Sequence, residues 1–169
     1  MPQYRLGELF CGPGGIAYGA TTADIKNPDF RIVHEWATDY DRDTCATYAH
    51  NICKANLEDV QSVICKDIRK FDLHGLPEID ALAFGFPCND YSVVGEQKGM
   101  DGVYGPLYSF GVNALKIFRP IWFLAENVGG LRNANDGKAF SKILDDMRSA
   151  GYDLVPHLYK FEEYGVPQA

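Results

Sequence analysis

Short apolar runs alternate along the chain with longer stretches in which apolar residues recur every three or four positions. Runs bounded by glycine, proline or charged residues are typical of strands buried in a parallel sheet, and they lie at residues 5–11, 31–38, 80–86 and 120–125. Stretches with helical periodicity lie at residues 15–25, 41–54, 108–118 and 137–150. The alternation predicts an α/β fold with a doubly wound, mostly parallel sheet and helices on both faces.

Two segments depart from this alternation. Residues 87–105 contain several glycines and little periodicity, and a long irregular loop inside a compact domain is usually functional. Residues 154–161 predict one more strand, after which the sequence runs to Ala169 without another helical pattern.

Length and composition favour one ordinary globular domain. The chain has 169 residues, of which 46% are hydrophobic and 23% charged, so disorder is not expected. No apolar run is long enough to span a membrane, and the first residues lack the order of a signal peptide. We therefore expect a cytoplasmic protein.

Charge and cysteine content narrow the function classes. The formal net charge of −7 disfavours a module whose main task is to coat phosphates, so a nucleic-acid partner would have to be held locally. The five cysteines form no C-x-x-C pair, which argues against a disulfide framework and against a paired zinc site. We expect reduced thiols and no metal.

A glycine cluster follows the first predicted strand and precedes the first predicted helix. Phe10 ends the strand, and Gly12, Pro13 and Gly14 form a turn where a ligand can approach the backbone closely. The spacing differs from the Gly-x-Gly-x-x-Gly pattern of dinucleotide folds and suits an adenosine ligand without a pyrophosphate. A tight turn without a ligand is the alternative explanation.

Acidic residues at the ends of the next strands complete a predicted adenosine pocket. Asp39 is placed to accept hydrogen bonds from a ribose diol, and Tyr40 beside it can stack on a base. Asp67, which is followed by Ile68, is placed to accept from an adenine amino group. As alternatives, Asp39 is a helix cap and Asp67 a surface loop acid.

A thiol and a carboxyl group follow two other strands at the same predicted edge. Cys88 lies just past a strand end and has polar neighbours, unlike Cys11, Cys45, Cys53 and Cys65, for which inert, buried thiols are expected. Glu126 leaves an apolar strand, where burial would favour the neutral carboxyl group and make it a candidate general acid. As an alternative, Glu126 caps the turn at Gly129.

These motifs resemble those of the cytosine-5 DNA methyltransferases. The family pattern Phe-x-Gly-x-Gly-Gly begins at Phe10, Pro-Cys-x-x-(Phe/Tyr)-Ser runs from Pro87 to Ser92, and Glu-Asn-Val begins at Glu126. The ending Tyr-Gly-Val-Pro-Gln resembles the start of the family's Gln-x-Arg-x-Arg element. The order agrees over almost the whole chain.

The resemblance implies S-adenosylmethionine as the cofactor and a flipped cytosine as the substrate. Cys88 would be the nucleophile on carbon 6, and Glu126 would contact ring nitrogen 3 and the amino group. Ser92, Asn127 and Val128 would contact the substrate. The cofactor would be held by Phe10, Gly12, Pro13, Gly14, Asp39, Tyr40, Asp67, Ile68, Pro87 and Leu107.

The chain departs from the family pattern in three places. Asn89 and Tyr91 replace the usual Gln and Phe, and the sequence stops at Ala169, before the arginines, the target-recognition domain and a closing helix. We therefore expect residues 1–169 to be one incomplete cofactor-binding and catalytic domain. We also expect weak DNA binding, little activity alone, and self-association or a complementary subunit at the exposed edge.

Three other functions stay open on the sequence alone. A tRNA cytosine-5 methyltransferase shares the same thiol and Glu-Asn-Val elements. A catalytically silent cofactor-binding or regulatory subunit would need neither Cys88 nor Glu126. A nicotinamide-dependent dehydrogenase is disfavoured by the glycine spacing.

Overall fold

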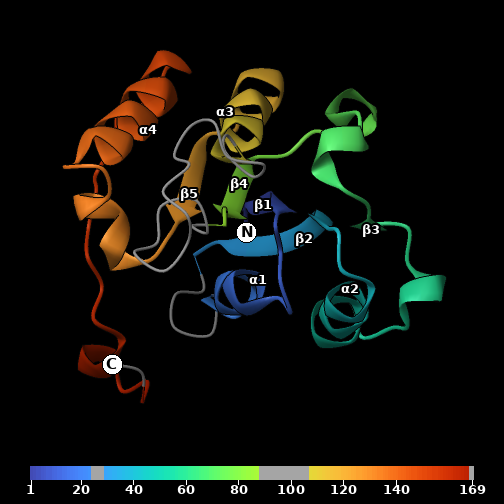
Figure 1. Ribbon diagram of the computed structural model, residues 1–169. Helices are drawn as coiled ribbons and strands as arrows, with labels where there is room; N and C mark the ends of the chain where they lie inside the picture. Colours follow the sequence, from blue (N-terminus) through green and yellow to red (C-terminus); the bar gives the residue numbers. More distant parts are fainter. Residues whose placement is uncertain (24–28, 88–106, 168–169) are drawn as a thin grey trace.

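Five parallel strands form one sheet in the order β3-β2-β1-β4-β5 (Figure 1). The computed structural model describes residues 1–23, 29–87 and 107–167. The strands are β1 (Gln3–Leu9), β2 (Arg31–Asp39), β3 (Val63–Cys65), β4 (Ala81–Gly85) and β5 (Trp122–Glu126). Because all five run in the same direction, their carboxyl ends meet at one edge of the sheet.

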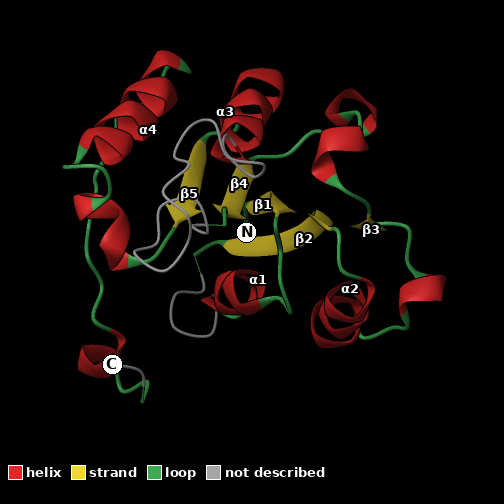
Figure 2. Cartoon of the chain, viewed as in Figure 1, coloured by secondary structure: helices red, strands yellow, loops and turns green. Residues whose placement is uncertain are grey.

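Helices cover both faces of the sheet (Figure 2). On one face lie α1 (Gly15–Thr21) and α2 (Arg42–Tyr48), and α2 continues into a π-helical turn at Ala49–Cys53. On the other face lie α3 (Leu107–Phe118) and α4 (Lys138–Ser149). The predicted doubly wound α/β class is confirmed.

Each face has its own hydrophobic core. Leu9, Leu82 and Phe84 pack on the side of α3 and α4, while Leu6 and Ala83 pack on the side of α1 and α2. The alternation of inward side chains along β1 and β4 therefore divides the apolar residues between two layers, as expected for a sheet that is buried on both faces.

A β-bulge interrupts the pairing of β1 with β2. Leu6 pairs with His34 and Gly7 pairs with Trp36, so Glu35 is an extra residue in β2. Trp36 then faces the α3 side, where its indole fills the space above Gly7: a Cβ at Gly7 would lie 2.5 Å from the Trp36 ring. His34, on the other side of the bulge, faces α2.

The structure corrects three sequence predictions. Residues 154–161 do not form a strand: residues 152–160 have no regular structure and make no backbone ladder with β5. Pro156 lies inside this segment and has no backbone N–H to donate to a ladder, which disfavours a strand here. Helix α1 ends at Thr21, and the helix predicted from residue 41 is α-helical only to Tyr48. The predicted loop at residues 87–105 lies outside the described residues except for Pro87.

None of the helices in the described ranges is long and apolar enough to cross a membrane.

Candidate active site

The glycine turn after β1 has a backbone that needs glycine. Gly12 and Gly14 have φ angles of 54° and 96°, in the left-handed region that side chains disfavour. Gly14 is also buried, and a Cβ there would lie 2.9 Å from Ile52 and 3.1 Å from Tyr48. The turn is therefore packed from below by α2 and its π-helical extension, while Pro13 is exposed.

Asp39 joins the end of β2 to this turn. Its carboxylate accepts from the amide of Gly12 at 3.1 Å and from the amide of Asp41 at 3.1 Å. Asp41 is the residue that caps α2, because its Oδ1 accepts from the Thr44 amide at 2.8 Å. The cap proposed as an alternative for Asp39 is thus supplied by Asp41, and Asp39 is hydrogen-bonded to the glycine turn itself.

Tyr40, next to Asp39, presents its ring to solvent. The side chain is 78% exposed, although large aromatic residues usually bury most of their surface. An exposed ring at the tip of a central strand is available for stacking on a planar ligand.

Asp67 follows β3 and is held by its own neighbours. Its carboxylate accepts from the Arg69 side chain at 2.7 to 3.1 Å and from the Arg69 amide at 3.0 Å. The Arg69 hydrogen bonds lower the pKa of Asp67 to about 2, so the group is ionised at neutral pH. Ile68, the next residue, is 7% exposed and packs into the core.

Glu126 ends β5 beside the end of β4. The two strands pair Gly85 with Glu126, and a Cβ at Gly85 would lie 3.3 Å from Glu126 Oε2. The carboxyl group therefore lies over the backbone of β4 at Gly85. Gly85 precedes Cys88 by three residues in the sequence. Glu126 is exposed, so the burial expected from its apolar strand is wrong: among the described residues, β5 is an edge strand with a neighbour only on its β4 side.

Asn127 links the same two strand ends. Its Nδ2 donates to the Phe86 carbonyl at 2.7 Å, and its Oδ1 accepts from the Val128 amide at 2.9 Å. Asn127 thereby fixes the point at which the chain leaves β4 toward Pro87 and Cys88. Val128 is 56% exposed.

The structure places most of the predicted residues at one edge of the sheet. The turn after β1, the ends of β2 and β3, and Glu126 all lie at the carboxyl ends of parallel strands, and Pro87 and Leu107 flank the undescribed segment there. Cys88 and Ser92 lie outside the described residues, so their predicted positions stay predictions.

The burial expected for the other four cysteines is found at two of them. Cys11 and Cys45 are 4% and 0% exposed, and Cys53 and Cys65 are half-buried. Burial raises the pKa of Cys45 to about 12 and also raises the pKa values of Cys11 and Cys53. Cys11, Cys45 and Cys53 are therefore protonated at neutral pH and are poor nucleophiles.

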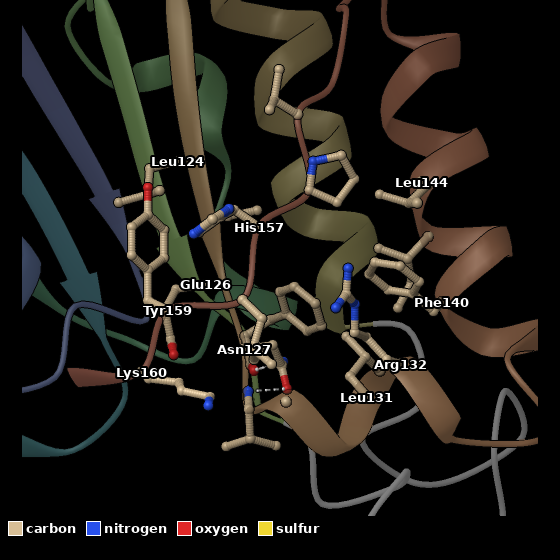
Figure 3. Close-up of a pocket in the computed structure, with 18 of the residues that line it drawn as sticks. Leu124, Glu126, Asn127, Leu131, Arg132, Phe140, Leu144, His157, Tyr159 and Lys160 are labelled. Atoms are coloured by element: carbon tan, nitrogen blue, oxygen red, sulfur yellow. Dashed lines mark hydrogen bonds between the residues drawn. The ribbon is translucent and has the colours of Figure 1, made fainter. Parts of the chain in front are cut away.

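A cavity of about 590 Å³ lies beside the β5 edge (Figure 3). One side is formed by Leu124, Glu126 and Asn127, and the side chains of His157 and Tyr159 come from the irregular segment at residues 152–160. The cavity therefore lies between the end of β5 and part of the irregular segment, which contacts β5 through the Tyr152 and Phe123 rings.

Sequence reasoning missed a buried polar group directly below the glycine turn. Glu8 of β1 is 1% exposed and accepts a hydrogen bond from the Tyr48 hydroxyl at 3.2 Å. The signal in the sequence was a glutamate between Gly7 and Leu9 inside an apolar strand, because a carboxyl group is rarely placed in a core without a partner.

Comparison with known proteins agrees with the family resemblance of the sequence motifs. The model of the C-5 cytosine-specific DNA methylases matches residues 4–169. The chain belongs to this family. It is 56% identical to the type II methyltransferase M.BbvI of Brevibacillus brevis, covering 98% of this chain and 46% of that protein. It is 33% identical to M.NgoFVII of Neisseria gonorrhoeae, covering 97% of this chain and 41% of that protein.

Solved structures share the fold. A DNA modification methyltransferase encoded within an E. coli prophage superposes with a TM-score of 0.61 at 21% identity, over 86% of this chain and 38% of that one. The S. pombe Dnmt2 methyltransferase superposes with a TM-score of 0.59 at 18% identity, over 85% and 40% of the two chains. The family match confirms the predicted family, and with it S-adenosylmethionine as the methyl donor. This cytosine-5 methylase chain spans less than half the length of these relatives.

Proposed function

We propose that this chain is the cofactor-binding and catalytic region of a DNA (cytosine-5)-methyltransferase. The observation that carries the proposal is the position of the Glu126 carboxylate over Gly85, three residues before Cys88 and at the sheet edge that also bears the glycine turn. A carboxyl group and a thiol that flank a flipped cytosine are what its methylation at carbon 5 requires.

The cofactor site follows the carboxyl edge of the sheet. Phe10 and Gly12 to Gly14 would hold the methionine part, and Asp39 with Tyr40 would hold the ribose and one face of the adenine. Asp67 and the backbone of Ile68 would meet the adenine edge, with Pro87 and Leu107 as a wall. The exposed Tyr40 ring and the placement of Asp39 against the turn support this arrangement. S-adenosylmethionine supplies an electrophilic methyl group there.

The proposed chemistry depends on two side chains. The Cys88 thiolate adds to carbon 6 of the flipped cytosine, while Glu126 contacts ring nitrogen 3 and the exocyclic amino group and so stabilises the charge that develops on the ring. Carbon 5 thereby becomes nucleophilic enough to take the methyl group, and S-adenosylhomocysteine would be the leaving group. Transfer of the carbon 5 proton to water then breaks the bond between carbon 6 and sulfur, releases the Cys88 thiolate and restores the aromatic ring.

We infer that DNA is the substrate and that the protein acts on it in the cytoplasm. Ser92 and Val128 would contact it directly, and Asn127 would act through the segment that carries Cys88, since its amide is bonded to Phe86. The net charge of −7 predicts weak DNA binding by residues 1–169 without a basic recognition domain.

The β5 edge is the proposed surface for more polypeptide. Leu124 is 45% exposed there, and β5 has a neighbouring strand only on its β4 side in the described part of the chain. An open strand edge with apolar side chains promotes pairing with another strand. We propose that the isolated chain self-associates through this edge. In an enzyme of two different subunits, the complementary subunit would cover the same edge.

A chimera tests the catalytic proposal. The region of M.BbvI that aligns with this chain is replaced by residues 1–169, and transfer of tritiated methyl groups to duplex DNA is measured. We expect activity, its complete loss with Cys88→Ser, and a loss of about 10²- to 10³-fold in kcat with Glu126→Gln. Cys53→Ser, a thiol replacement away from the edge, is the matched control. Activity that survives Cys88→Ser would refute the nucleophile, and methylation of tRNA in place of DNA would refute the substrate.

A cofactor titration tests the binding site in the isolated chain. S-adenosylmethionine should raise the unfolding temperature, and NAD should not, because a ligand that binds only the native state stabilises it. Asp39→Asn should reduce the shift. Stabilisation by NAD alone would support the dehydrogenase instead.

A further inference from the structure

A chain of four polar side chains runs from the sheet surface into the core beneath the glycine turn. Ser62 Oγ lies 2.9 Å from His34 Nε2, His34 Nδ1 lies 3.2 Å from the Tyr48 hydroxyl, and Tyr48 donates to Glu8 Oε2 at 3.2 Å. The proposed chemistry uses none of these four side chains.

The donors and acceptors of this chain have one consistent direction. Since the Tyr48 hydroxyl donates its hydrogen to Glu8, its oxygen accepts from His34 Nδ1, and Nε2 then accepts from Ser62. Burial lowers the pKa of His34 to about 4, which agrees with a neutral ring. Burial also raises the pKa of Glu8 to about 8, so the carboxyl group is mainly neutral at pH 7.

The Tyr48 ring connects this polar chain to the cofactor turn. Its Cδ2 lies 3.1 Å from where a Cβ of Gly14 would be, so the ring is in direct contact with the turn. The hydroxyl at the other end is tied to Glu8 in the central strand. The bulge at Glu35 contributes as well, because it lets His34 face α2 while Trp36 faces the opposite core.

We propose that Glu8 and Tyr48 are positioning residues for the cofactor: their buried hydrogen bond fixes the Tyr48 ring under Gly14 and holds the glycine turn in its binding shape. The inference rests on the proposed function, because it takes the turn to be the S-adenosylmethionine site. It assigns a role to a buried pair that does not touch the ligand.

The first test is a double-mutant cycle on cofactor affinity. The Kd of S-adenosylmethionine is measured by calorimetry at pH 7 for wild type, Tyr48→Phe, Glu8→Leu and the double variant. Each single variant should bind about three- to tenfold more weakly, the factor expected for one buried hydrogen bond. The double variant should be no weaker than the weaker single, because both remove the same interaction.

Two further variants separate positioning from general stability. Glu8→Gln keeps a neutral acceptor for the Tyr48 hydroxyl and should bind within about twofold of wild type. Tyr152→Phe removes another half-buried tyrosine hydrogen bond, 2.8 Å to the Pro120 carbonyl, far from the turn in the fold, and should leave Kd unchanged. Wild-type affinity in Tyr48→Phe, or additive losses in the double variant, would overturn the proposal.

Hydrogen exchange of the free chain tests the same contact without cofactor. The amides of Gly12 and Gly14 are bonded to Asp39 Oδ2 and to the Cys11 carbonyl. They should exchange about three- to tenfold faster in Tyr48→Phe and Glu8→Leu, but not in Glu8→Gln or Tyr152→Phe. Unchanged exchange would overturn the proposal. Faster exchange in a chain that does not bind S-adenosylmethionine would uphold the contact and contradict the proposed function.

Discussion

Glu8 shows how one titratable side chain can make the stability of the whole chain depend on pH. Its ordinary pKa of 4.5 applies in the unfolded chain, and burial raises the folded pKa to about 8. Between these values the unfolded chain loses the proton and the folded chain keeps it. Stability is therefore lost as pH rises from 4.5 to about 8.

Glu8→Gln should remove this dependence. The stability of the variant relative to wild type should increase from pH 4.5 to pH 8, by at most about 5 kcal/mol, because each pH unit contributes about 1.4 kcal/mol. Urea unfolding at pH 5 and pH 8 measures the difference. His34, whose pKa is lowered, contributes an opposite slope below pH 6.5 in both proteins and cancels in the comparison. An equal difference at the two pH values would contradict the burial of a neutral Glu8.

At the residue scale, the strand-end groups of the candidate site could be predicted from the sequence more readily than the buried residues beneath them. Asp39 and Glu126 are strand-end carboxylates, which topology alone brings to one edge. The partner of Glu8 lies 40 positions away at Tyr48, and no local pattern relates two residues from different elements. The exposure of Glu126 depends on β5 being at an edge, which its apolar sequence does not show.

At the level of elements, the short apolar runs predicted the four strands β1, β2, β4 and β5, because strands inside an α/β sheet are rich in apolar residues. The bulge at Glu35 was not predictable, because β2 has no break in its pattern. The strand predicted at residues 154–161 fails because the prediction gave no weight to Pro156, which cannot donate a backbone hydrogen bond to a ladder. The π-helical turn after Tyr48 depends on how α2 packs around Gly14.

Two helical glycines should respond in opposite directions to the same substitution. Gly111 of α3 lies against β4, where a Cβ would be 2.4 Å from the Phe84 ring, so Gly111→Ala should lower the free energy of unfolding by about 1–3 kcal/mol. Gly19 of α1 has no atom within 4 Å of its Cβ position, so Gly19→Ala should raise it by about 0.5–1 kcal/mol. Urea unfolding of both variants checks the signs. A stabilised Gly111→Ala would mean that α3 is not packed on Phe84 in solution.

For the whole molecule, the main consequence of the sheet order is that no strand of the described ranges pairs with the outer side of β5. The central strands β1 and β4 have neighbours on both sides, whereas β5 borders a cavity. The net charge of −7 opposes association over long distances, and the apolar edge favours it at contact.

Leu124→Lys should therefore reduce self-association. A lysine on an edge strand blocks pairing with another strand, because the ammonium group would lose its hydration. Sedimentation equilibrium should show a larger fraction of monomer than for wild type. Tyr18→Lys adds the same charge at an exposed position of α1 and should not change the monomer fraction. Equal dissociation by both variants would attribute the effect to net charge instead of the edge.

Because of its bulge, β2 should tolerate the deletion of one residue. Deleting one residue from a central strand normally turns every side chain on one side of the deletion to the opposite face of the sheet. Here His34 already faces α2 and Trp36 already faces α3, as adjacent residues of a regular strand would. A chain shortened by Glu35 would keep every inward side chain on its present face, so the strand would lose a kink and gain a regular ladder.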